Sequence, residues 1–209
     1  MNTFNQESPM SRADQRAQTR QRILDAARAR FEQDGFEGAS VREIAQEAGV
    51  AAGTVIMHFD GKAELLHAAL FEELERALDE ALAPQAEGVP FVDALDAVGE
   101  RMFAAYTARP TLSRVLLKES LFAPAPWAER FVGQHQRVHA WIQARGAEEL
   151  PPDALALFGV AWLSFFTYAL LAWAQGAHPS PVGLLSRLSR QHLAAAAAPS
   201  APWRQGELG

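Results

Sequence analysis

The stretch that most constrains the fold is GFEGASVREIAQEAGVAAGTVIMHF, residues 35–59, in which glycines separate two short apolar patterns. Ser40 stands three residues before Glu43, the spacing of a capping box at the start of a helix. Apolar residues then recur every three or four positions, and Gly49 can adopt the left-handed conformation that ends a helix. A second apolar pattern follows and ends at Phe59. Two short helices joined by a tight turn, a helix-turn-helix, are therefore predicted.

Glycine and proline divide the rest of the chain into helical segments, and no stretch alternates apolar and polar residues as a half-buried strand does. We predict an all-α fold of about nine helices. The expected ranges are 16–34, two short helices within 40–59, 62–82, 91–108, 111–122, 127–146, 153–175 and 181–197. The helix at 62–82 would span roughly 30 Å, long enough to connect a small N-terminal bundle to a second domain.

Composition narrows the classes of protein. The chain has no cysteine, which excludes disulfides and cysteine-liganded metals and fits a reducing cytoplasm. The N-terminus has no apolar run of a signal peptide, so we expect a cytoplasmic location. A net charge of -6 excludes a generally basic surface, but residues 1–30 hold six arginines and three acids, and this end could approach phosphate.

The segment 153–175 is apolar nearly all round and carries no charge between Ala154 and Ala174. Its length would permit a membrane span. It is rich in alanine, contains Ser164 and Thr167, and lacks flanking lysine or arginine. We therefore predict a buried helix of a helical bundle and no association with a membrane.

Residues 19–70 resemble the N-terminal domain of TetR-type transcriptional repressors. The resemblance rests on ILDAA in the first helix, the pair Gly35-Phe36, the segment SVREIA from Ser40, the turn AGV, and Gly53-Thr54 followed by His58-Phe59 and Lys62. It implies a helix-turn-helix domain at 16–61 and, at 62–198, a connector helix with a helical ligand-binding and dimerisation domain. Residues 1–15 and 199–209 would be a mobile arm and a mobile tail.

By this resemblance, residues 50–59 form the recognition helix that enters the major groove of an operator in double-stranded DNA. The expected DNA-binding residues are Ser40, Arg42, Ala51, Ala52, Gly53, Thr54, Ile56, Met57, His58 and Lys62. Thr54, His58 and Lys62 can contact phosphates, while Ser40 and Arg42 lie where the second helix would cross the backbone.

The recognition helix departs from the family pattern. Family members often carry a polar residue near Ala52 and a tyrosine at the place of Ile56, and both hydrogen-bonding groups are absent here. Base readout could depend on contacts of Ala51, Ala52 and Met57 with thymine methyl groups, on Arg42, or on the N-terminal arginines.

Aromatic residues gather in the C-terminal part of the chain, where most must build the core and a few could line a cavity. The expected ligand-binding residues are Phe103, Tyr106, Trp127, Phe131, His135, Trp162 and Phe166. The expected dimerisation residues, from the last two helices, are Phe158, Trp162, Phe165, Trp173, Leu184, Leu185 and Leu188. His135 and His139 share a helical face, but no acid completes a metal motif, so we predict no metal and no cofactor.

Together these features predict a homodimeric regulator, not an enzyme. It would repress transcription from a palindromic operator and be released by a small apolar or aromatic effector. One alternative is a small-molecule-binding protein of the same fold whose specific DNA binding has been lost. Two weaker alternatives are an enzyme that uses the aromatic cavity and a membrane-anchored regulator.

Overall fold

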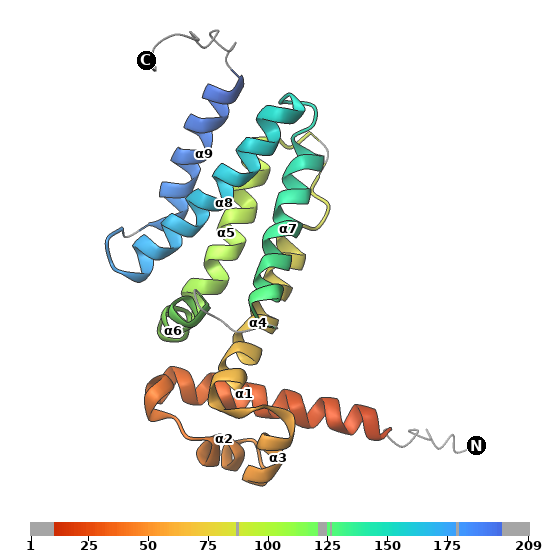
Figure 1. The fold of residues 1–209 in the computed structure, drawn as a ribbon, viewed down its shortest axis with the longest axis vertical. Coiled ribbons are helices and arrows are strands. Elements are labelled where there is room, and N and C mark those ends of the chain that lie inside the picture. The colour runs from red at the N-terminus through yellow and green to blue at the C-terminus, as the bar shows by residue number, and fades with distance from the viewer. Residues whose placement is uncertain (1–10, 87, 121–124, 126, 179, 198–209) are drawn as a thin grey trace, which may run out of the picture. The chain divides into compact units, whose positions relative to one another are not determined.

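The computed structural model describes residues 11–86, 88–120, 125, 127–178 and 180–197. These residues form nine α-helices and no strand, which confirms the predicted all-α fold (Figure 1). The helices are α1 (Arg12–Gly38), α2 (Val41–Glu47), α3 (Ala52–His58), α4 (Gly61–Ala81), α5 (Phe91–Ala108), α6 (Pro110–Ser120), α7 (Trp127–Arg145), α8 (Pro152–Ala174) and α9 (Pro181–Ala197).

Contacts between residues divide the chain inside α4 into two compact units. Unit 1 is Met1–Glu72 and unit 2 is Glu73–Gly209. The functional boundaries expected from the sequence, with a DNA-binding domain to residue 61 and a ligand-binding and dimerisation domain from residue 62, stay predictions.

α1 begins at Arg12, earlier than the expected residue 16, because Ser11 and Asp14 form a capping box. The Ser11 hydroxyl oxygen accepts from the Asp14 N–H, and an Asp14 carboxylate oxygen accepts from the Ser11 N–H, both at 3.1 Å. Residues 12–15 are therefore helical, which corrects that part of the predicted mobile arm. The rest of the predicted arm through residue 10, and the predicted tail 199–209, lie outside the described residues.

The core of unit 1 follows from the apolar spacing of its helices. Helical geometry in α1 breaks at Gly35, the expected stop, where φ is 73°. Before that break, one face of α1 is fully buried, and α2 and α4 add buried residues to the same core. The side chains with no exposed surface are Ile23, Leu24, Ala27, Phe31, Ile44, Leu65, Leu66 and Ala69.

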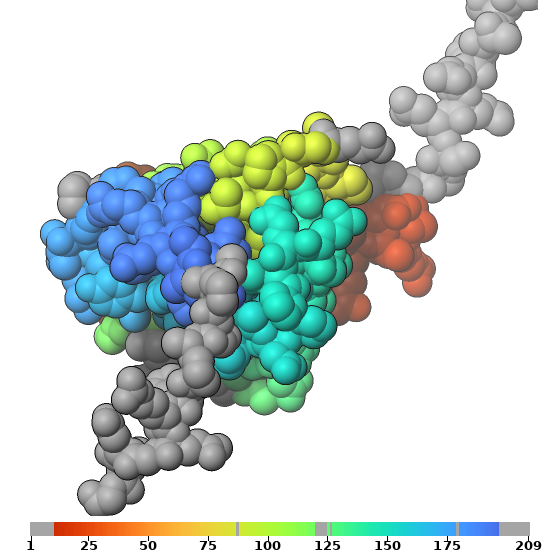
Figure 2. All heavy atoms as spheres, turned by 90° about the horizontal axis from the view of Figure 1, so that it is seen from above, coloured from red at the N-terminus to blue at the C-terminus, as the bar shows by residue number. Residues whose placement is uncertain are grey.

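In unit 2, α9 packs against α5 and α8, and α8 also packs against α7. Figure 2 shows the blue atoms of α9 beside the light-blue atoms of α8 and the yellow-green atoms of α5. Two glycines permit these close approaches. A Cβ at Gly99 would lie 2.7 Å from Leu185 Cδ2 on α9, and one at Gly159 would lie 2.8 Å from His139 Cδ2 on α7.

α8 is long and apolar enough to cross a membrane by length and composition, and 39% of its most apolar window is buried. Its buried side faces the core of unit 2 through residues that include Phe158 and Trp162. Leu157, Val160 and Tyr168 are exposed by 72%, 58% and 61%. One side of this apolar helix is therefore covered by its own unit, and another is not.

Candidate nucleic-acid interface and effector cavity

The helix-turn-helix begins with a capping box on α2. The Glu43 N–H donates to the Ser40 hydroxyl, and the Ser40 N–H donates to a Glu43 carboxylate oxygen, both at 3.2 Å. The Ser40 hydroxyl also donates to the same carboxylate at 2.6 Å. These hydrogen bonds lower the pKa of Glu43, because they favour its charged form. Ser40 is thus committed to starting α2, and its N–H and hydroxyl are both used within the protein.

The turn after α2 depends on Gly49, whose φ is 67°. The Gly49 N–H donates to the Gln46 carbonyl at 3.2 Å, and the Val50 N–H donates to the Ala45 carbonyl at 2.9 Å. These bonds close the end of α2 and turn the chain into α3. α3 has no side-chain cap at its start, because Ala51 occupies that position. Its placement therefore depends on packing.

The two sides of α3 differ sharply in burial. Val55 and, directly after the helix, Phe59 are 1% and 3% exposed. On the other side Ile56 and Met57 are exposed by 65% and 82%. The remaining expected DNA-binding residues of this segment are also accessible: Ala51, Ala52 and Gly53 are exposed, and Thr54 and His58 are half-buried. The structure thus brings these residues together on one outward surface of unit 1.

Lys62 has a structural role in addition to its expected contact with phosphate. Its ammonium group donates to the carbonyls of Glu37 at 3.2 Å and Ala39 at 3.3 Å, and lies 4.7 Å from the ring centroid of Phe36. These contacts hold the end of α1 to the start of α4. An ammonium group has three donors, so one more is available for a phosphate oxygen. Arg42, on α2, is exposed.

His58 lies near arginines of α1, a proximity that the sequence did not predict. Burial and the charges of Arg16 and Arg20 lower the pKa of His58, so its imidazole is neutral at pH 7. The Arg20 guanidinium lies 5.2 Å from the ring centroid of Phe59 and forms an ion pair with Glu72. The sequence signal that could have indicated this proximity is the spacing of Arg16 and Arg20, which are four residues apart and therefore share one face of α1.

Not all six arginines of residues 1–30 can approach phosphate. Arg28 is 5% exposed, and its Nε donates to the Ala69 carbonyl at 2.7 Å. Arg30 forms ion pairs with Asp34 at 3.1 Å and Glu47 at 2.9 Å. These two side chains stabilise unit 1. The exposed arginines of the stretch are Arg12, Arg16 and Arg22.

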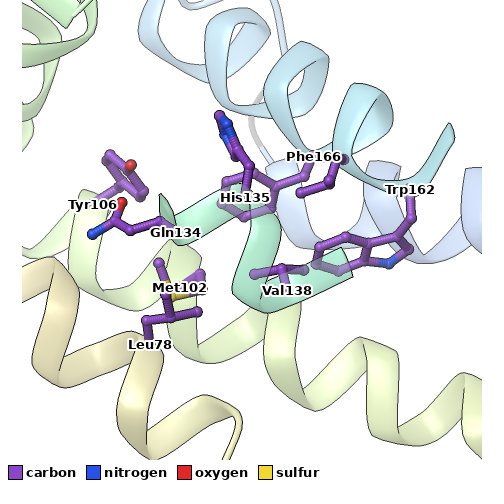
Figure 3. A pocket seen from close by; sticks show the side chains of 9 residues that line it. Leu78, Met102, Tyr106, Gln134, His135, Val138, Trp162 and Phe166 are labelled. Atoms are coloured by element: carbon purple, nitrogen blue, oxygen red, sulfur yellow. The ribbon is translucent and has the colours of Figure 1, made fainter. Parts of the chain in front are cut away.

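Unit 2 contains a small cavity of about 30 Å³ between α4, α5, α7 and α8 (Figure 3). Its lining residues are Leu78, Met102, Tyr106, Gln134, His135, Val138, Trp162, Leu163 and Phe166. Four residues that the sequence suggested are among them: Tyr106, His135, Trp162 and Phe166. The other three, Phe103, Trp127 and Phe131, do not line it, and Phe103 and Trp127 are buried.

Phe166 stands in the middle of an aromatic cluster at this cavity. Its ring is stacked on Phe103 at 4.7 Å and on Trp162 at 5.8 Å, and it meets Tyr106 tilted at 6.3 Å, all between ring centroids. The cavity holds space for about one water molecule, whereas sites for small-molecule ligands usually measure about 300–1,000 Å³. An effector must therefore displace side chains to enter.

The polar groups around the cavity are uncharged. Burial raises the pKa of Tyr106 to about 12 and lowers the pKa of His135, so both side chains are neutral at pH 7. The Gln134 amide donates to a Glu75 carboxylate oxygen at 2.6 Å, and Arg137 pairs with the same carboxylate at 2.9 Å. Within the described residues, no group of three or more histidine, aspartate or glutamate side chains could hold a metal.

The expected dimerisation residues fall into two groups. Phe158, Trp162 and Leu185 are at most 2% exposed within their own unit, so they have no surface to offer a partner. The half-buried members are Phe165, Trp173, Leu184 and Leu188. The most exposed apolar residues of α8, Leu157, Val160 and Tyr168, were not predicted, although their three- and eight-residue spacing places them on one side of the helix.

Residues 23–69 match the family described as "Bacterial regulatory proteins, tetR family". The chain is 30% identical over 159 residues to the "HTH-type transcriptional repressor KstR" of Rhodococcus jostii (strain RHA1), covering 74% of this chain and 72% of that relative. It is 29% identical over 163 residues to the "HTH-type transcriptional regulator UidR" of Escherichia coli (strain K12), covering 74% and 80%. A solved tetR-family regulator from Streptomyces coelicolor shares the fold, with a TM-score of 0.70 and 22% identity over 87% of this chain and 82% of its own.

Proposed function

The chain belongs to the tetR family of bacterial transcriptional regulators, and from this premise we propose that it is a repressor that binds a palindromic operator as a homodimer and is released by a small apolar or aromatic effector. Soluble regulators of this family are cytoplasmic, and we extend that location to this chain. Its named relatives are transcriptional regulators, and we propose no catalytic activity.

The observation that carries the proposal is the division of α3 into a buried and an exposed side. Val55 and Phe59 anchor the helix in the core of unit 1, so the exposed side is held in a fixed orientation. A helix presented in this way fits the major groove of B-form DNA. Thr54 and His58 supply neutral donors for phosphate oxygens, and Lys62 and Arg42 supply charged ones.

A second copy of the chain is the proposed partner for the uncovered side of α8. Leu157, Val160 and Tyr168 form an exposed apolar row, which a soluble protein rarely leaves in water. Half-buried Leu184 and Leu188 on α9 would extend the same interface. A two-fold dimer would present two α3 helices to half-sites ~34–36 Å apart or a multiple of that spacing, which implies an inverted repeat.

The proposed effector enters the cavity of unit 2. The lining is apolar except for the neutral polar groups of Tyr106, Gln134, His135 and the indole of Trp162, so an uncharged aromatic molecule with one or two hydrogen-bonding groups fits its chemistry. Entry requires Phe166 to leave its stack, because the closed cavity is too small. Phe166 is half-buried.

α4 is the proposed connection between effector and DNA. This single helix contributes Leu78 to the cavity wall and, near its other end, Lys62 to the contacts with the end of α1. A displacement of Leu78 by the effector would be transmitted along the helix to residues next to the recognition surface. An effector that binds the altered arrangement more tightly would lower the affinity for DNA, and bound DNA would lower the affinity for the effector by the same factor.

Selection from random duplex DNA tests the proposal most directly. The full chain should enrich an inverted repeat, and binding to that repeat should weaken steeply with salt. Absence of enrichment would contradict specific DNA binding and favour the alternative of a small-molecule-binding protein. Addition of neutral aromatic compounds should then release the selected DNA.

Sedimentation analysis tests the dimer separately. Leu157→Glu should raise the dissociation constant of the dimer on the order of a hundredfold, because the change removes, from both copies, an apolar side chain that the proposed dimer would bury. Val132→Glu is the matched control, because Val132 is exposed by 52% on α7, which is not one of the two helices of the proposed interface. A Leu157→Glu protein that stays dimeric would show that another surface forms the dimer.

A further inference from the structure

We propose that Ile56 and Met57 read thymine by contact with its 5-methyl group, which would make them the specificity-determining residues of α3. This inference rests on the proposed DNA binding, and it further predicts that each half-site contains thymine at the contacted position. Recognition would come from apolar contact in the major groove rather than from hydrogen bonds to base edges.

Exposure of these two side chains is unusual for unit 1. Among its described residues, the large apolar side chains classed as exposed are Ile56, at 65%, and Met57, at 82%. They are adjacent on a helix of seven residues, whose opposite side buries Val55. Val55 and Phe59 already anchor α3, so the outward pair is not needed to hold the helix in place. These two side chains are therefore free to contact a partner.

Arginine side chains lie near this apolar pair, and their charge favours a polyanionic partner. Arg16 and Arg20 lie close enough to His58, at the end of α3, to lower the pKa of its imidazole. Arg42 is exposed on α2, the preceding helix of the motif. An apolar centre beside cationic side chains complements a nucleic-acid groove, whose floor carries bases and whose walls carry phosphates. A purely apolar protein partner would leave the exposed charges of Arg16 and Arg42 without a complement.

The chemistry of the two side chains then selects the base. Isoleucine has no hydrogen-bonding group, and methionine has only a weakly accepting sulfur, so neither is suited to pair with the polar groups of base edges. Thymine is the base that presents a methyl group in the major groove. Ile56 is β-branched and therefore stiff at χ1, whereas Met57 is flexible and can adapt to a neighbouring methyl group. Exposed Ala52, four residues before Ile56, adds a smaller apolar contact on the same face.

Replacement of thymine by uracil removes the methyl group and leaves base pairing intact. In the duplex selected by the full chain, each such replacement at a thymine of the half-site should weaken binding about fourfold, from ~0.8 kcal/mol for each buried methyl group. Replacing equivalent thymines in both half-sites should weaken binding roughly sixteenfold. Uracil placed outside the repeat is the control and should leave the dissociation constant unchanged.

A protein variant ties the effect to these residues. Ile56→Ala combined with Met57→Ala should weaken binding to the thymine duplex and make thymine and uracil duplexes equivalent. Both side chains are exposed, so the variant keeps the buried contacts of α3. Val132→Ala, an exposed apolar change on α7, is the matched control and should preserve the thymine preference.

Three results would overturn the inference. One is a selected half-site without thymine, another is equal binding of the thymine and uracil duplexes, and the third is a thymine preference that survives in the double variant. Each of these leaves the proposed function intact, because an inverted repeat has still been recovered. Failure to select any DNA sequence would instead overturn the proposed function together with this inference.

Discussion

Substitution of Gly53 on α3 should affect the stability of the protein and its affinity for DNA in opposite directions. The residue lies in the first turn of a seven-residue helix, and it is not among the glycines with positive φ. A Cβ built at this position meets no atom within 4 Å. Neither backbone conformation nor packing within unit 1 therefore requires glycine. We propose that the missing side chain lets DNA approach the backbone of α3.

Gly53→Ala should stabilise the free protein. Glycine in a helix interior costs about 0.8–1.0 kcal/mol relative to alanine, and somewhat less in the first turn, so we expect a gain of about 0.5–1 kcal/mol. For a chain of this size that corresponds to a rise in Tm of about 1–4 °C. Urea denaturation followed by circular dichroism measures the change in the free energy of unfolding.

The same substitution should weaken DNA binding. A methyl group on the outward surface of α3 would hold the backbone away from DNA and cost one charge-assisted hydrogen bond to phosphate in each half-site. Such a bond contributes about 1.5–3 kcal/mol, which corresponds to roughly a tenfold to hundredfold weaker complex for each recognition helix. Fluorescence anisotropy with the selected inverted repeat measures the dissociation constant.

Gly133→Ala is the matched control. Gly133 lies inside α7 in unit 2, and a Cβ there also meets nothing within 4 Å. It should stabilise the protein to a similar degree and leave DNA binding unchanged. If Gly53→Ala binds the repeat as tightly as the unmodified chain, the glycine does not serve DNA approach. If Gly53→Ala lowers the free energy of unfolding, the conclusion that neither backbone conformation nor packing requires glycine at this position is wrong.

Three further predictions concern single side chains. Ser40→Ala should cost about 1 kcal/mol of stability in urea denaturation, since it removes the side-chain cap of α2, and Ser40→Thr should retain most of it. DNA affinity should rise between pH 7 and pH 5.5, because protonated His58 gains a charge beside phosphate. Over the same range the free protein should lose stability as pH falls from 6.5 through the lowered pKa values of His58 and His135, so His58→Gln should remove the pH dependence of DNA affinity and reduce, but not abolish, that of stability. Phe166→Ala should destabilise the protein by about 2–4 kcal/mol and allow a small aromatic probe such as indole to raise its Tm, whereas unchanged Tm with indole would contradict the proposed role of Phe166 in closing the cavity.

Local signals explain why the helix-turn-helix could be predicted from the sequence. The Ser40 and Glu43 pair and the positive φ of Gly49 act within a few residues, so their spacing alone reveals the turn. The start of α1 depends on an equally local pair, Ser11 and Asp14, in which aspartate takes the position of the usual glutamate. The prediction, which placed the start at about residue 16, did not use this pair, and the helix begins at Arg12.

The cavity and the uncovered side of α8 depend on contacts between distant segments. Aromatic composition indicated Tyr106 and Phe166, but Leu78 and Gln134 reach the cavity only through the packing of four helices. Similarly, α8 is apolar on every side, so its sequence contains no periodic signal that separates buried Phe158 from exposed Leu157. Only the packed structure distinguishes the side that faces its own core from the side that is exposed.

This difference in burial decides which substitutions can test function. α3 has seven residues and no side-chain cap, so by itself it would be unstable, and its position depends on Val55 and Phe59 in the core. Replacing either anchor would abolish DNA binding by displacing the helix, whatever the helix reads. Gly53 and the exposed Ile56–Met57 pair contribute little to that core. Changes at these outward positions can therefore alter affinity or base preference while the fold persists, which makes them the substitutions that distinguish a reading surface from a structural one.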